Sequence, residues 1–563
     1  MRHMGRYDER NREYQIKLMS ALAKVFPGQE PEEDPCCTGF TMLRGETFSF
    51  VAAYTCGGGD GGRGNFDAVV RVESPAAEYC RIREIVPVPS LRPVNSCADS
   101  NYLRTQPGMY PDLLTEPAGG RITFTPGQFK SLWIDVEIPE NGPYGDIPVA
   151  VVFASPEEEE LCRRETSIKV YRTVLGPQRL LRTEWFHGDC LADYYQVPVF
   201  SEEHWRIMEN FISAAAARGC NMILTPQFTP PLDTAPGGER TTIQLVGVKV
   251  LPGGGYEFDF SRLERWAAMC LSCGMTCFEM SHLFTQWGAG HPPKIMAEEN
   301  GKEIKLFGWD DPAVGGRYTT FLEAYLPRLT EKLRELGIAG ITRFHISDEP
   351  EPQHLLSYKQ AKESVAPYLK DFIIMDAISS LAVCREGEID CPVCSNDHME
   401  PFLEAGVTPL WSYYCTAQDY LVSNRFMAMP SARCRIYGAQ VFKYGMEGIL
   451  HWGYNFYNSQ YSLKTLDPYR STDADGAFPS GDSFLVYPGA DGKPEESIRM
   501  MVLCHTMQDV RAMEQLADKK GREYVVDMLE EDLGEPITFK RYPKSDYWIL
   551  QMRNRINREL DED

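Results

Sequence analysis

The fold class is decided by residues 201–225, which read SEEHWRIMENFISAAAARGCNMILT. Ser201 can cap a helix, and Glu202 and Glu203 suit its first turn because the helix dipole is positive there. An apolar stripe at helical spacing follows, and Gly219 can end the helix in a left-handed conformation. The run 221–225 then has the apolar character of a buried strand. The stretch therefore predicts a helix that leads through one glycine into a strand.

The same order of helix, glycine and strand recurs along the chain, at Gly274, Gly337, Gly406 and Gly445. The predicted helices cover 262–273, 319–336, 401–405 and a segment ending at 444. Eight apolar runs are candidate strands: 180–186, 221–225, 275–280, 342–346, 372–377, 408–414, 448–451 and 484–487. Apolar strands that alternate with helices are typical of a parallel sheet covered on both faces. Eight units predict a (β/α)8 TIM barrel. A doubly wound open sheet is the alternative, but no GxGxxG or P-loop motif supports it.

Other patterns flank the predicted barrel. Residues from about 40 to 175 contain short alternating or β-branched runs separated by turn signals such as Pro126-Gly127, which is typical of a β-sandwich. Residues 13–25 are predicted as a helix, 497–516 as the last barrel helix, and 548–560 as an amphipathic helix. We therefore expect an N-terminal helix and β-sandwich domain (1–176), a (β/α)8 barrel catalytic domain (177–525), and a C-terminal helical extension packed on the barrel (526–563).

Composition narrows the classes of partner. The 563 residues include 57 Lys and Arg against 80 Asp and Glu, a net charge of −23. Such a surface repels phosphate backbones and anionic lipids, so we expect neither nucleic acid nor membrane insertion. The N-terminal residues contain no apolar segment that could act as a signal peptide, which favours a cytoplasmic location. The oligomeric state is left open.

The 17 cysteines are an odd number without a small-scaffold pattern, which favours reduced thiols over a disulfide framework. Two CxxC pairs, Cys270 with Cys273 and Cys391 with Cys394, could in principle bind zinc. The first pair lies inside a predicted helix, and the two pairs are far apart in sequence. We therefore expect no metal and no cofactor.

Candidate site residues are those just after each predicted strand, because barrel active sites lie at the C-terminal ends of the strands. Aromatic, carboxylate, histidine and amide side chains gather there: His187, Asp189, His282, Trp287, Asp348, Glu349, Tyr413, Trp452, Tyr454 and Asn455. Flat aromatic faces beside planar hydrogen-bonding groups suit a sugar ring. Any single ring could also be an ordinary core aromatic. The coincidence of many at strand ends predicts a saccharide site.

The sharpest motif is Asp348-Glu349-Pro350. Glycosidic cleavage needs an acid for the leaving oxygen and a negative group near the anomeric centre. Neighbouring residues of a strand point to opposite faces, so two adjacent carboxylates do not normally flank a bond. At a strand end, with Pro350 opposing helix continuation, the chain can turn both into one pocket. This suits a mechanism in which the substrate's 2-acetamido group is the nucleophile, Glu349 the acid/base and Asp348 the stabiliser. The alternative is a solvated helix start.

Four motifs carry a family resemblance: HISDEP at 345–350, HWGYNFY at 451–457, WFHGDCLADYY at 185–195 and GDSFLVYPG at 481–489. With them the chain resembles glycoside hydrolase family 123 and related bacterial barrel proteins of unknown function. The resemblance implies a retaining exo-β-N-acetylgalactosaminidase that uses substrate-assisted catalysis on terminal N-acetylgalactosamine of glycans or glycolipids. It carries over Asp348 and Glu349 as the catalytic pair. It also implies that Trp452, Tyr454 and Asn455 belong to the sugar pocket, with a tyrosine hydroxyl on the acetamido oxygen.

Two other interpretations stay open. The first is a glycosidase for a different sugar, with Glu184, Asp189 or Glu279 as the nucleophile. The second is a non-catalytic carbohydrate-binding protein that has kept the barrel. The intact acid pair argues against the second, because a binding protein has no need for a proton donor.

Overall fold

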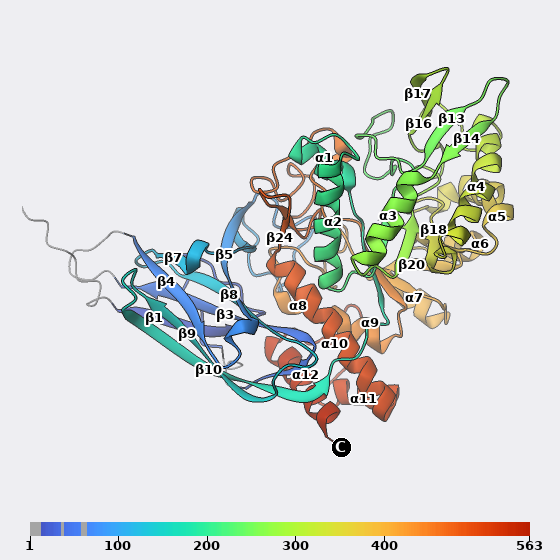
Figure 1. The fold of residues 1–563 in the computed structure, drawn as a ribbon. Coiled ribbons are helices and arrows are strands. Elements are labelled where there is room, and N and C mark those ends of the chain that lie inside the picture. Colours follow the sequence, from blue (N-terminus) through green and yellow to red (C-terminus); the bar gives the residue numbers. More distant parts are fainter. Residues whose placement is uncertain (1–12, 35–38, 58–64, 563) are drawn as a thin grey trace, which may run out of the picture.

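The computed structural model describes residues 13–34, 39–57 and 65–562. The N-terminal part consists of two five-stranded sheets, in the order β1-β3-β8-β5-β6 and β2-β10-β9-β4-β7, which form the blue and teal half of Figure 1. Apolar side chains of both sheets share one buried cluster, so the sheets pack face to face. The strands are β1 (Tyr14–Ser20), β2 (Phe40–Arg44), β3 (Glu46–Cys56), β4 (Phe66–Glu73), β5 (Cys80–Ser90), β6 (Gly108–Thr115), β7 (Arg121–Phe124), β8 (Lys130–Ile138), β9 (Gly145–Ala154) and β10 (Glu160–Val174).

The predicted N-terminal helix is wrong. Residues 14–20 form strand β1, which pairs antiparallel with β3 from Tyr14 opposite Cys56 to Ser20 opposite Phe50. Pairing with an available sheet edge satisfies the backbone and buries Ile16, and such tertiary context overrides weak helix propensity.

The second part is a closed barrel of eight parallel strands, which confirms the predicted barrel behind an N-terminal β domain. Its order is β11-β12-β15-β18-β19-β20-β21-β22. The bounds are β11 (Leu181–Glu184), β12 (Met222–Thr225), β15 (Cys277–Met280), β18 (Thr342–Phe344), β19 (Ile373–Ala377), β20 (Cys391–Ser395), β21 (Trp411–Tyr413) and β22 (Gly448–His451). A small sheet of β14 (Tyr256–Asp259), β13 (Gly247–Val250), β16 (Ile295–Glu299) and β17 (Lys302–Phe307) projects from the long segments after β12 and β15 (Figure 1).

The opening stretch of sequence folds as predicted. The hydroxyl of Ser201 accepts a hydrogen bond from the backbone N–H of His204, and Gly219 adopts a φ of +89° before β12. The helices are α1 (Gly188–Tyr195), α2 (Glu202–Ala217), α3 (Ser261–Ser272), α4 (Arg317–Glu335), α5 (Leu355–Leu369), α6 (Leu381–Glu386), α7 (Met399–Glu404), α8 (Ser431–Arg435), α9 (Tyr437–Lys443), α10 (Ile498–Lys520), α11 (Arg522–Glu530) and α12 (Asp546–Asp561). None of the helices in the described ranges is long and apolar enough to cross a membrane.

One predicted barrel strand is wrong. Within residues 484–487, Phe484 makes a single bridge to Asn455, and Tyr487 begins the two-residue strand β23 (Tyr487–Pro488), which pairs with β24 (Pro494–Glu495). The missing barrel strand is β20, between β19 and β21. Its sequence, CPVCS, contains a proline, which normally argues against an interior strand, and a CxxC pair that resembles a metal-binding loop.

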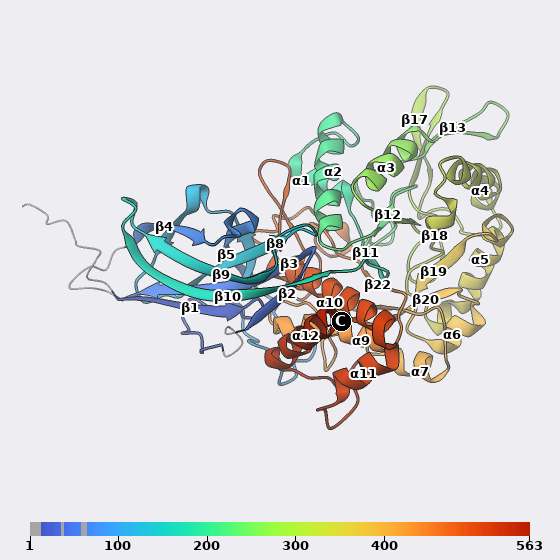
Figure 2. The same cartoon turned by 60° about the horizontal axis from the view of Figure 1, so that its bottom comes forward.

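The C-terminal helices join the two parts of the molecule. α10 packs on α8 and α9 and also touches β3 and β6, while α12 packs on α10 and against β2 and β10. Figures 1 and 2 show these red helices beside both the barrel and the blue-green sheets. The last helix therefore covers the N-terminal sheets as well as α10, and is not packed on the barrel alone.

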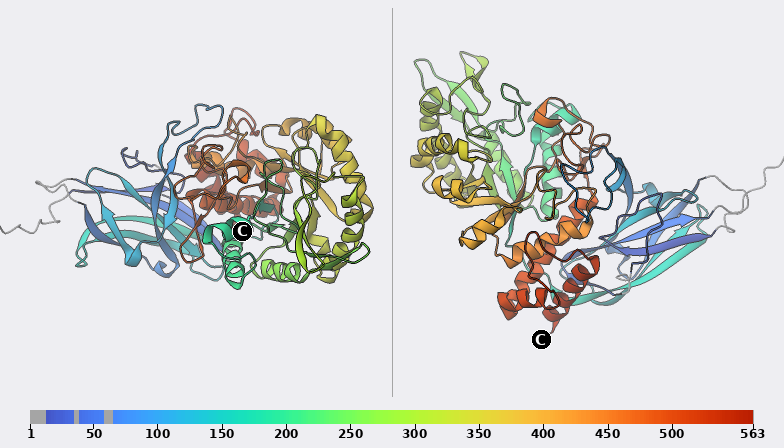
Figure 3. Two further views of the ribbon diagram at one scale, coloured as in Figure 1. Left: turned by 90° about the horizontal axis from the view of Figure 1, so that it is seen from above. Right: turned by 180° about the vertical axis from the view of Figure 1, so that it is seen from behind.

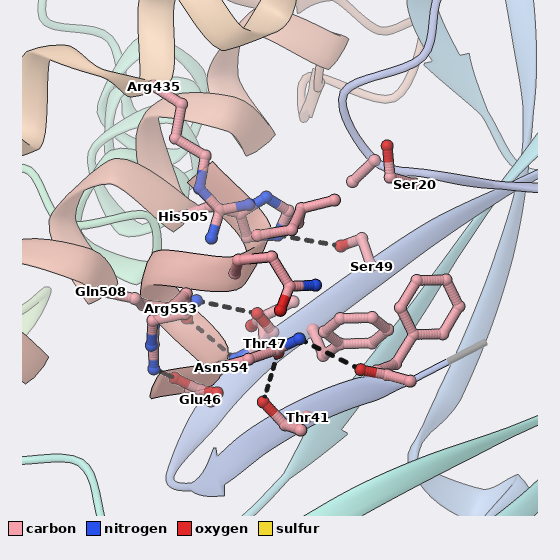
Figure 4. Close-up of a pocket in the computed structure, with 16 residues that line it drawn as sticks. Ser20, Thr41, Glu46, Thr47, Ser49, Arg435, His505, Gln508, Arg553 and Asn554 are labelled. Atoms are coloured by element: carbon pink, nitrogen blue, oxygen red, sulfur yellow. Dashed lines mark hydrogen bonds and ion pairs between the residues drawn. The ribbon is translucent and has the colours of Figure 1, made fainter. Parts of the chain in front are cut away.

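Polar bonds fix this junction, as Figure 4 shows. The Gln508 side chain accepts from the backbone N–H of Thr47 and donates to its carbonyl, both at 2.8 Å. Arg553 forms ion pairs with Glu46 and, at 3.0 Å, with Asp509. Because these groups are buried, each would be costly to leave unpaired. The sheets and the barrel are thus held in one arrangement.

A loop from the N-terminal sheets also reaches the barrel. Residues 91–107, between β5 and β6, extend toward the C-terminal ends of the barrel strands. Asp419 accepts hydrogen bonds from the backbone N–H groups of Ser96 (2.7 Å) and Cys97 (2.9 Å). Asn95 donates to the carbonyl of Thr416 at 3.1 Å. Figure 3 shows the two parts of the molecule side by side from two further directions.

Candidate active site

A pocket opens at the C-terminal ends of the barrel strands. Its free space, mouth included, is about 740 Å³, a size typical of small-molecule sites. The lining residues are Trp185, His187, Leu232, Asp233, Gln286, Trp287, Asp348, Glu349, Ala377, Tyr413, Cys415, Thr416, Leu450, Trp452 and Phe478. Six of the ten predicted site residues are among them: His187, Trp287, Asp348, Glu349, Tyr413 and Trp452. The walls thus combine aromatic faces with carboxyl and amide groups.

Asp348 and Glu349 follow β18 and both line the pocket, where each is partly exposed. Glu349 has a φ of +46°, a left-handed conformation that is uncommon for residues other than glycine. The carbonyl of Asp348 accepts a hydrogen bond from the backbone N–H of Trp287 at 3.1 Å. This local turn is how two neighbouring carboxyl groups reach the same cavity.

Glu349 is hydrogen-bonded on the pocket side. The hydroxyl of Tyr413, at the end of β21, donates to its Oε1 at 2.6 Å, and Trp287 also bonds the carboxyl. Burial raises the pKa of Glu349 and outweighs these two hydrogen bonds, which lower it, while the charges of Glu351 and Asp397 raise it further. The carboxyl is therefore held protonated to higher pH than an ordinary glutamate.

Asp348 is affected in the same direction. Burial raises its pKa well above the ordinary value, the charge of Glu349 adds to the rise, and the nearby His345 opposes it. Two neighbouring carboxyl groups resist double ionisation, so the pair retains one proton beyond the usual carboxyl range. Asp348 and Glu349 can therefore act together as one protonated carboxyl group beside one carboxylate.

A buried network lies beneath the pair. His345 contacts Glu279 (Nε2 to Oε2, 2.9 Å) and Asp376 (Nδ1 to Oδ1, 3.3 Å), and Asp376 also accepts from the hydroxyl of Tyr358 at 2.7 Å. Although burial lowers it, the hydrogen bonds to Asp376 and Glu279 raise the pKa of His345 to about 9. The imidazolium is therefore the cation of a buried carboxylate–histidine–carboxylate array.

His282 does not reach the pocket. Its ring stacks on His345 with centroids 4.4 Å apart, and neither ring nitrogen has a hydrogen-bond partner among the described residues. Ligand atoms of His282, His345 and Asp376 lie within 4.8 Å of one another, which is close enough for a metal ion. However, both nitrogens of His345 already contact carboxylates. In addition, the lone pairs of ring nitrogens lie in the ring plane, so two stacked rings do not direct theirs toward one ion between them. The cluster fits a hydrogen-bonded network better than a metal centre.

Asp189 and His187 take different positions in one cluster. Asp189 is buried and forms a bidentate ion pair with Arg240, at 2.8 and 2.9 Å, so it does not face the pocket. His187 lines the pocket, accepts from Arg240 at Nδ1 (3.0 Å) and contacts the carbonyl of Trp452 through Nε2 (2.9 Å). Burial and the charge of Arg240 lower the pKa of His187 to about 4. It therefore presents a neutral ring to the pocket.

The alternative nucleophiles are not available. Glu184 is buried between Arg182 (2.9 Å) and Arg425 (2.7 Å), whose charges lower its pKa despite the burial. Glu279 is fully buried against His345. Neither of them, nor Asp189, lines the cavity. All three carboxylates serve buried ion pairs or hydrogen bonds.

The HWGYNFY motif contributes one pocket residue, not three. Trp452 lines the pocket, with its indole N–H on Asp482 at 3.0 Å. Tyr454 points away, and its hydroxyl donates to the carbonyl of Phe211 in α2 at 2.9 Å. Asn455 is buried and bonds both backbone groups of His187, so it positions that residue from behind. The tyrosine hydroxyl in the pocket is that of Tyr413.

Comparison with known proteins identifies the family of the chain. The family model "Glycoside hydrolase 123, catalytic domain" matches residues 185–516. The chain belongs to glycoside hydrolase family 123. Among solved structures, it is similar to a family 123 glycoside hydrolase from Clostridium perfringens, studied for glycolipid glycan hydrolysis, with 14% identity, 97% of both chains covered and a TM-score of 0.73. At that identity the likeness shows a shared fold. No curated protein matches the chain.

More distant similarities add no argument to the family assignment. A putative β-galactosidase from Bacteroides fragilis shares 11% identity over 80% of this chain and 57% of its own, with a TM-score of 0.30. A family 5 mannosidase from Rhizomucor miehei also shares 11% identity, over 59% of this chain and 94% of its own, with a TM-score of 0.32.

Sequence reasoning missed one carboxyl group of this family 123 pocket. Asp233 lines the cavity from the long segment after β12, and burial raises its pKa to about 6. It lies eight residues beyond the end of its strand, in a Pro-rich loop, so strand-end position gave no signal for it. Gln286, beside the predicted Trp287, was missed as well; its Oε1 accepts from the backbone N–H of Asp233 at 2.6 Å.

The CxxC cysteines of this family 123 chain lie in two separate elements. Cys270 is in α3, with Cys273 just after it, and Cys391 and Cys394 are both in β20. Within the described residues no metal-type cluster contains either pair, and the four thiols of the two pairs are free.

Proposed function

We propose that the protein is a retaining exo-β-N-acetylgalactosaminidase that uses substrate-assisted catalysis on a (β/α)8 barrel. The observation that carries the proposal is the pairing of Asp348 and Glu349 in one pocket, while Glu184, Asp189 and Glu279 are engaged elsewhere. The glycolipid glycan hydrolysis named for the Clostridium perfringens relative supports a glycan substrate.

In this mechanism Glu349 donates its proton to the glycosidic oxygen as the bond to the anomeric carbon breaks. The carbonyl oxygen of the substrate's acetamido group attacks that carbon from the opposite face and forms an oxazolinium ion. Asp348 accepts a hydrogen bond from the acetamido N–H and stabilises the developing positive charge. Glu349, now ionised, removes a proton from water, which opens the ring on the original face. Two inversions give retention of configuration.

A panel of aryl glycosides tests the proposal. We expect hydrolysis of the 2-acetamido-galactoside with retention at the anomeric carbon, and inhibition by a thiazoline analogue of the oxazoline. Activity confined to sugars without an acetamido group would refute the assisted mechanism. Measurable saccharide binding without any turnover would favour the carbohydrate-binding interpretation.

Variants assign the two carboxyl groups. Glu349→Gln should lose far more activity on substrates with poor leaving groups than on activated aryl glycosides, because only the former need protonation. Asp348→Asn should impair both, because it acts on ring closure. Glu363→Gln, an exposed acid on α5, is the matched control and should leave both activities unchanged. Equal losses for Glu349→Gln on both substrates would remove it from the acid role.

A further inference from the structure

Two exposed aromatic rings stand together at the mouth of the pocket. Trp287 is 43% exposed and Tyr461 is 38% exposed. Their ring centroids are 6.4 Å apart and the planes are perpendicular, at 89°. Trp287 lines the pocket itself, so the two rings continue its wall outward.

The backbone of this rim is held in a costly conformation. Asp233, Trp287 and Tyr461 have φ values of +40°, +57° and +60°, as Glu349 has nearby. Such a conformation is strained in a non-glycine residue and persists only where the surroundings impose it, often at ligand sites. Three segments, which follow β12, β15 and β22, meet here with the same strain.

Hydrogen bonds lock these segments to one another. The backbone N–H of Tyr461 donates to Oδ2 of Asp233 at 3.0 Å, and the hydroxyl of Ser462 donates to the Asp233 carbonyl at 2.8 Å. The backbone N–H of Asp233 donates to Gln286, next to Trp287. Oδ1 of Asp233 takes part in no hydrogen bond within the described residues, and it belongs to a pocket-lining side chain. The rim therefore presents one carboxylate oxygen beside two rings.

The position of Glu349 determines which part of a substrate this rim would meet. A proton donor must sit at the glycosidic oxygen, between the sugar in the pocket and the leaving group. Trp287 hydrogen-bonds Glu349 and extends from it toward solvent. The next ring outward, Tyr461, therefore lies on the side of the leaving group.

We propose that Trp287, Tyr461 and Asp233 form a subsite that binds the leaving-group sugar of a saccharide substrate. This inference rests on the proposed function, which places Glu349 at the glycosidic oxygen. The two rings offer faces for the C–H surface of a hexose, and the free oxygen of Asp233 accepts a hydroxyl hydrogen bond at its edge. A carboxylate beside the rings disfavours a lipid chain in the same place, because burying an ionised group against hydrocarbon is costly.

The test compares two substrates with the same acetamido sugar. One is a β-linked disaccharide with galactose as the leaving group; the other is the glycosyl fluoride, which has no leaving-group sugar. Tyr461→Gly removes the ring and suits the left-handed backbone, and Tyr461→Asn is a second variant that also tolerates it. We expect kcat/KM for the disaccharide to fall about fivefold to tenfold, as the loss of one stacking contact predicts, and the fluoride to change less than twofold.

Controls separate the outcomes. Tyr547→Ala removes an exposed tyrosine on α12, away from the pocket, and should affect neither substrate. Equal losses on both substrates, or an unchanged disaccharide rate, would overturn the subsite. A loss seen only with a glycolipid that carries the same disaccharide would assign the rim to a lipid instead of a sugar. Failure of the wild-type protein to hydrolyse the fluoride would refute the proposed function itself, which is a different result.

Discussion

The hydrogen bond from Tyr413 to Glu349 makes a definite prediction for the pH profile. This hydrogen bond, 2.6 Å long, stabilises the ionised carboxyl of Glu349. It therefore lowers the pKa of Glu349 relative to the effect of burial alone. Tyr413→Phe removes the hydroxyl and keeps the ring. The pKa of Glu349 should then rise further, and more of the protein should hold the proton that the proposed mechanism uses at a given pH above neutrality. The alkaline limb of kcat/KM is therefore expected to move to higher pH.

The size of the effect follows from hydrogen-bond energies. A hydrogen bond to a charged group contributes about 1.5–3 kcal/mol, and about 1.36 kcal/mol corresponds to a tenfold change in a proton equilibrium. Because Glu349 is partly exposed, the low end applies, and the limb should move by about one pH unit.

The assay measures kcat/KM from pH 5 to 9 on a substrate with a poor leaving group, for which protonation matters. Tyr457→Phe is the control, since its buried hydroxyl donates to the carbonyl of Val486 and not to Glu349. An alkaline limb that stays in place, or moves to lower pH, would show that Glu349 is not the acid that limits this substrate, or that Tyr413 does not stabilise its anion.

Three further predictions concern buried polar groups. Because the pKa of His345 is raised to about 9, its charge contributes fully to stability below about pH 6.5, and this contribution is lost as the pH rises through 9. His345→Gln should therefore reduce the pH dependence of the free energy of unfolding measured between pH 6 and 9.5. An unchanged pH dependence would show that His345 is not charged in the folded protein. Glu184→Gln leaves buried arginines without their counter-charge and should lower the free energy of unfolding by about 3–5 kcal/mol in denaturant titrations. If Glu184 were instead the nucleophile, the variant would lose activity with no loss of stability. Gln508→Ala leaves both backbone groups of Thr47 without a hydrogen-bond partner and should lower the free energy of unfolding by about 1–3 kcal/mol in the same assay, with the pH profile of activity unchanged. An unaffected denaturation midpoint would show that water replaces the side chain.

Much of the barrel is predictable from local signals, because the helix–glycine–strand order depends on backbone chemistry that neighbouring residues determine. The exceptions are strands whose identity depends on distant partners. Residues 14–20 pair with β3, and residues 391–395 pair with β19 and β21. In both segments this pairing, and not the local sequence, determines the strand conformation. At 484–487 the apolar run is buried, but by packing that involves no barrel pairing.

In the site, too, some features follow from local sequence and others depend on distant contacts. Strand-end position locates Asp348, Glu349, Tyr413 and Trp452, because the barrel brings all strand ends to one face. It does not determine the direction of a side chain a few residues later, so Tyr454 was assigned to the pocket although its hydroxyl bonds α2. Asp233 was missed because a long loop, and not a strand, carries it into the cavity. Loop conformation depends on contacts that no local pattern encodes.

The loop of residues 91–107 has a consequence for engineering. It supports Thr416, a wall residue whose hydroxyl donates to Asp482 at 2.5 Å, and Asp482 in turn receives the indole N–H of Trp452. One edge of the cavity is therefore scaffolded by a polypeptide segment from outside the barrel. An excised barrel, or a chimera with a foreign sandwich, would lose this brace, so the smallest transplantable unit includes the N-terminal sheets.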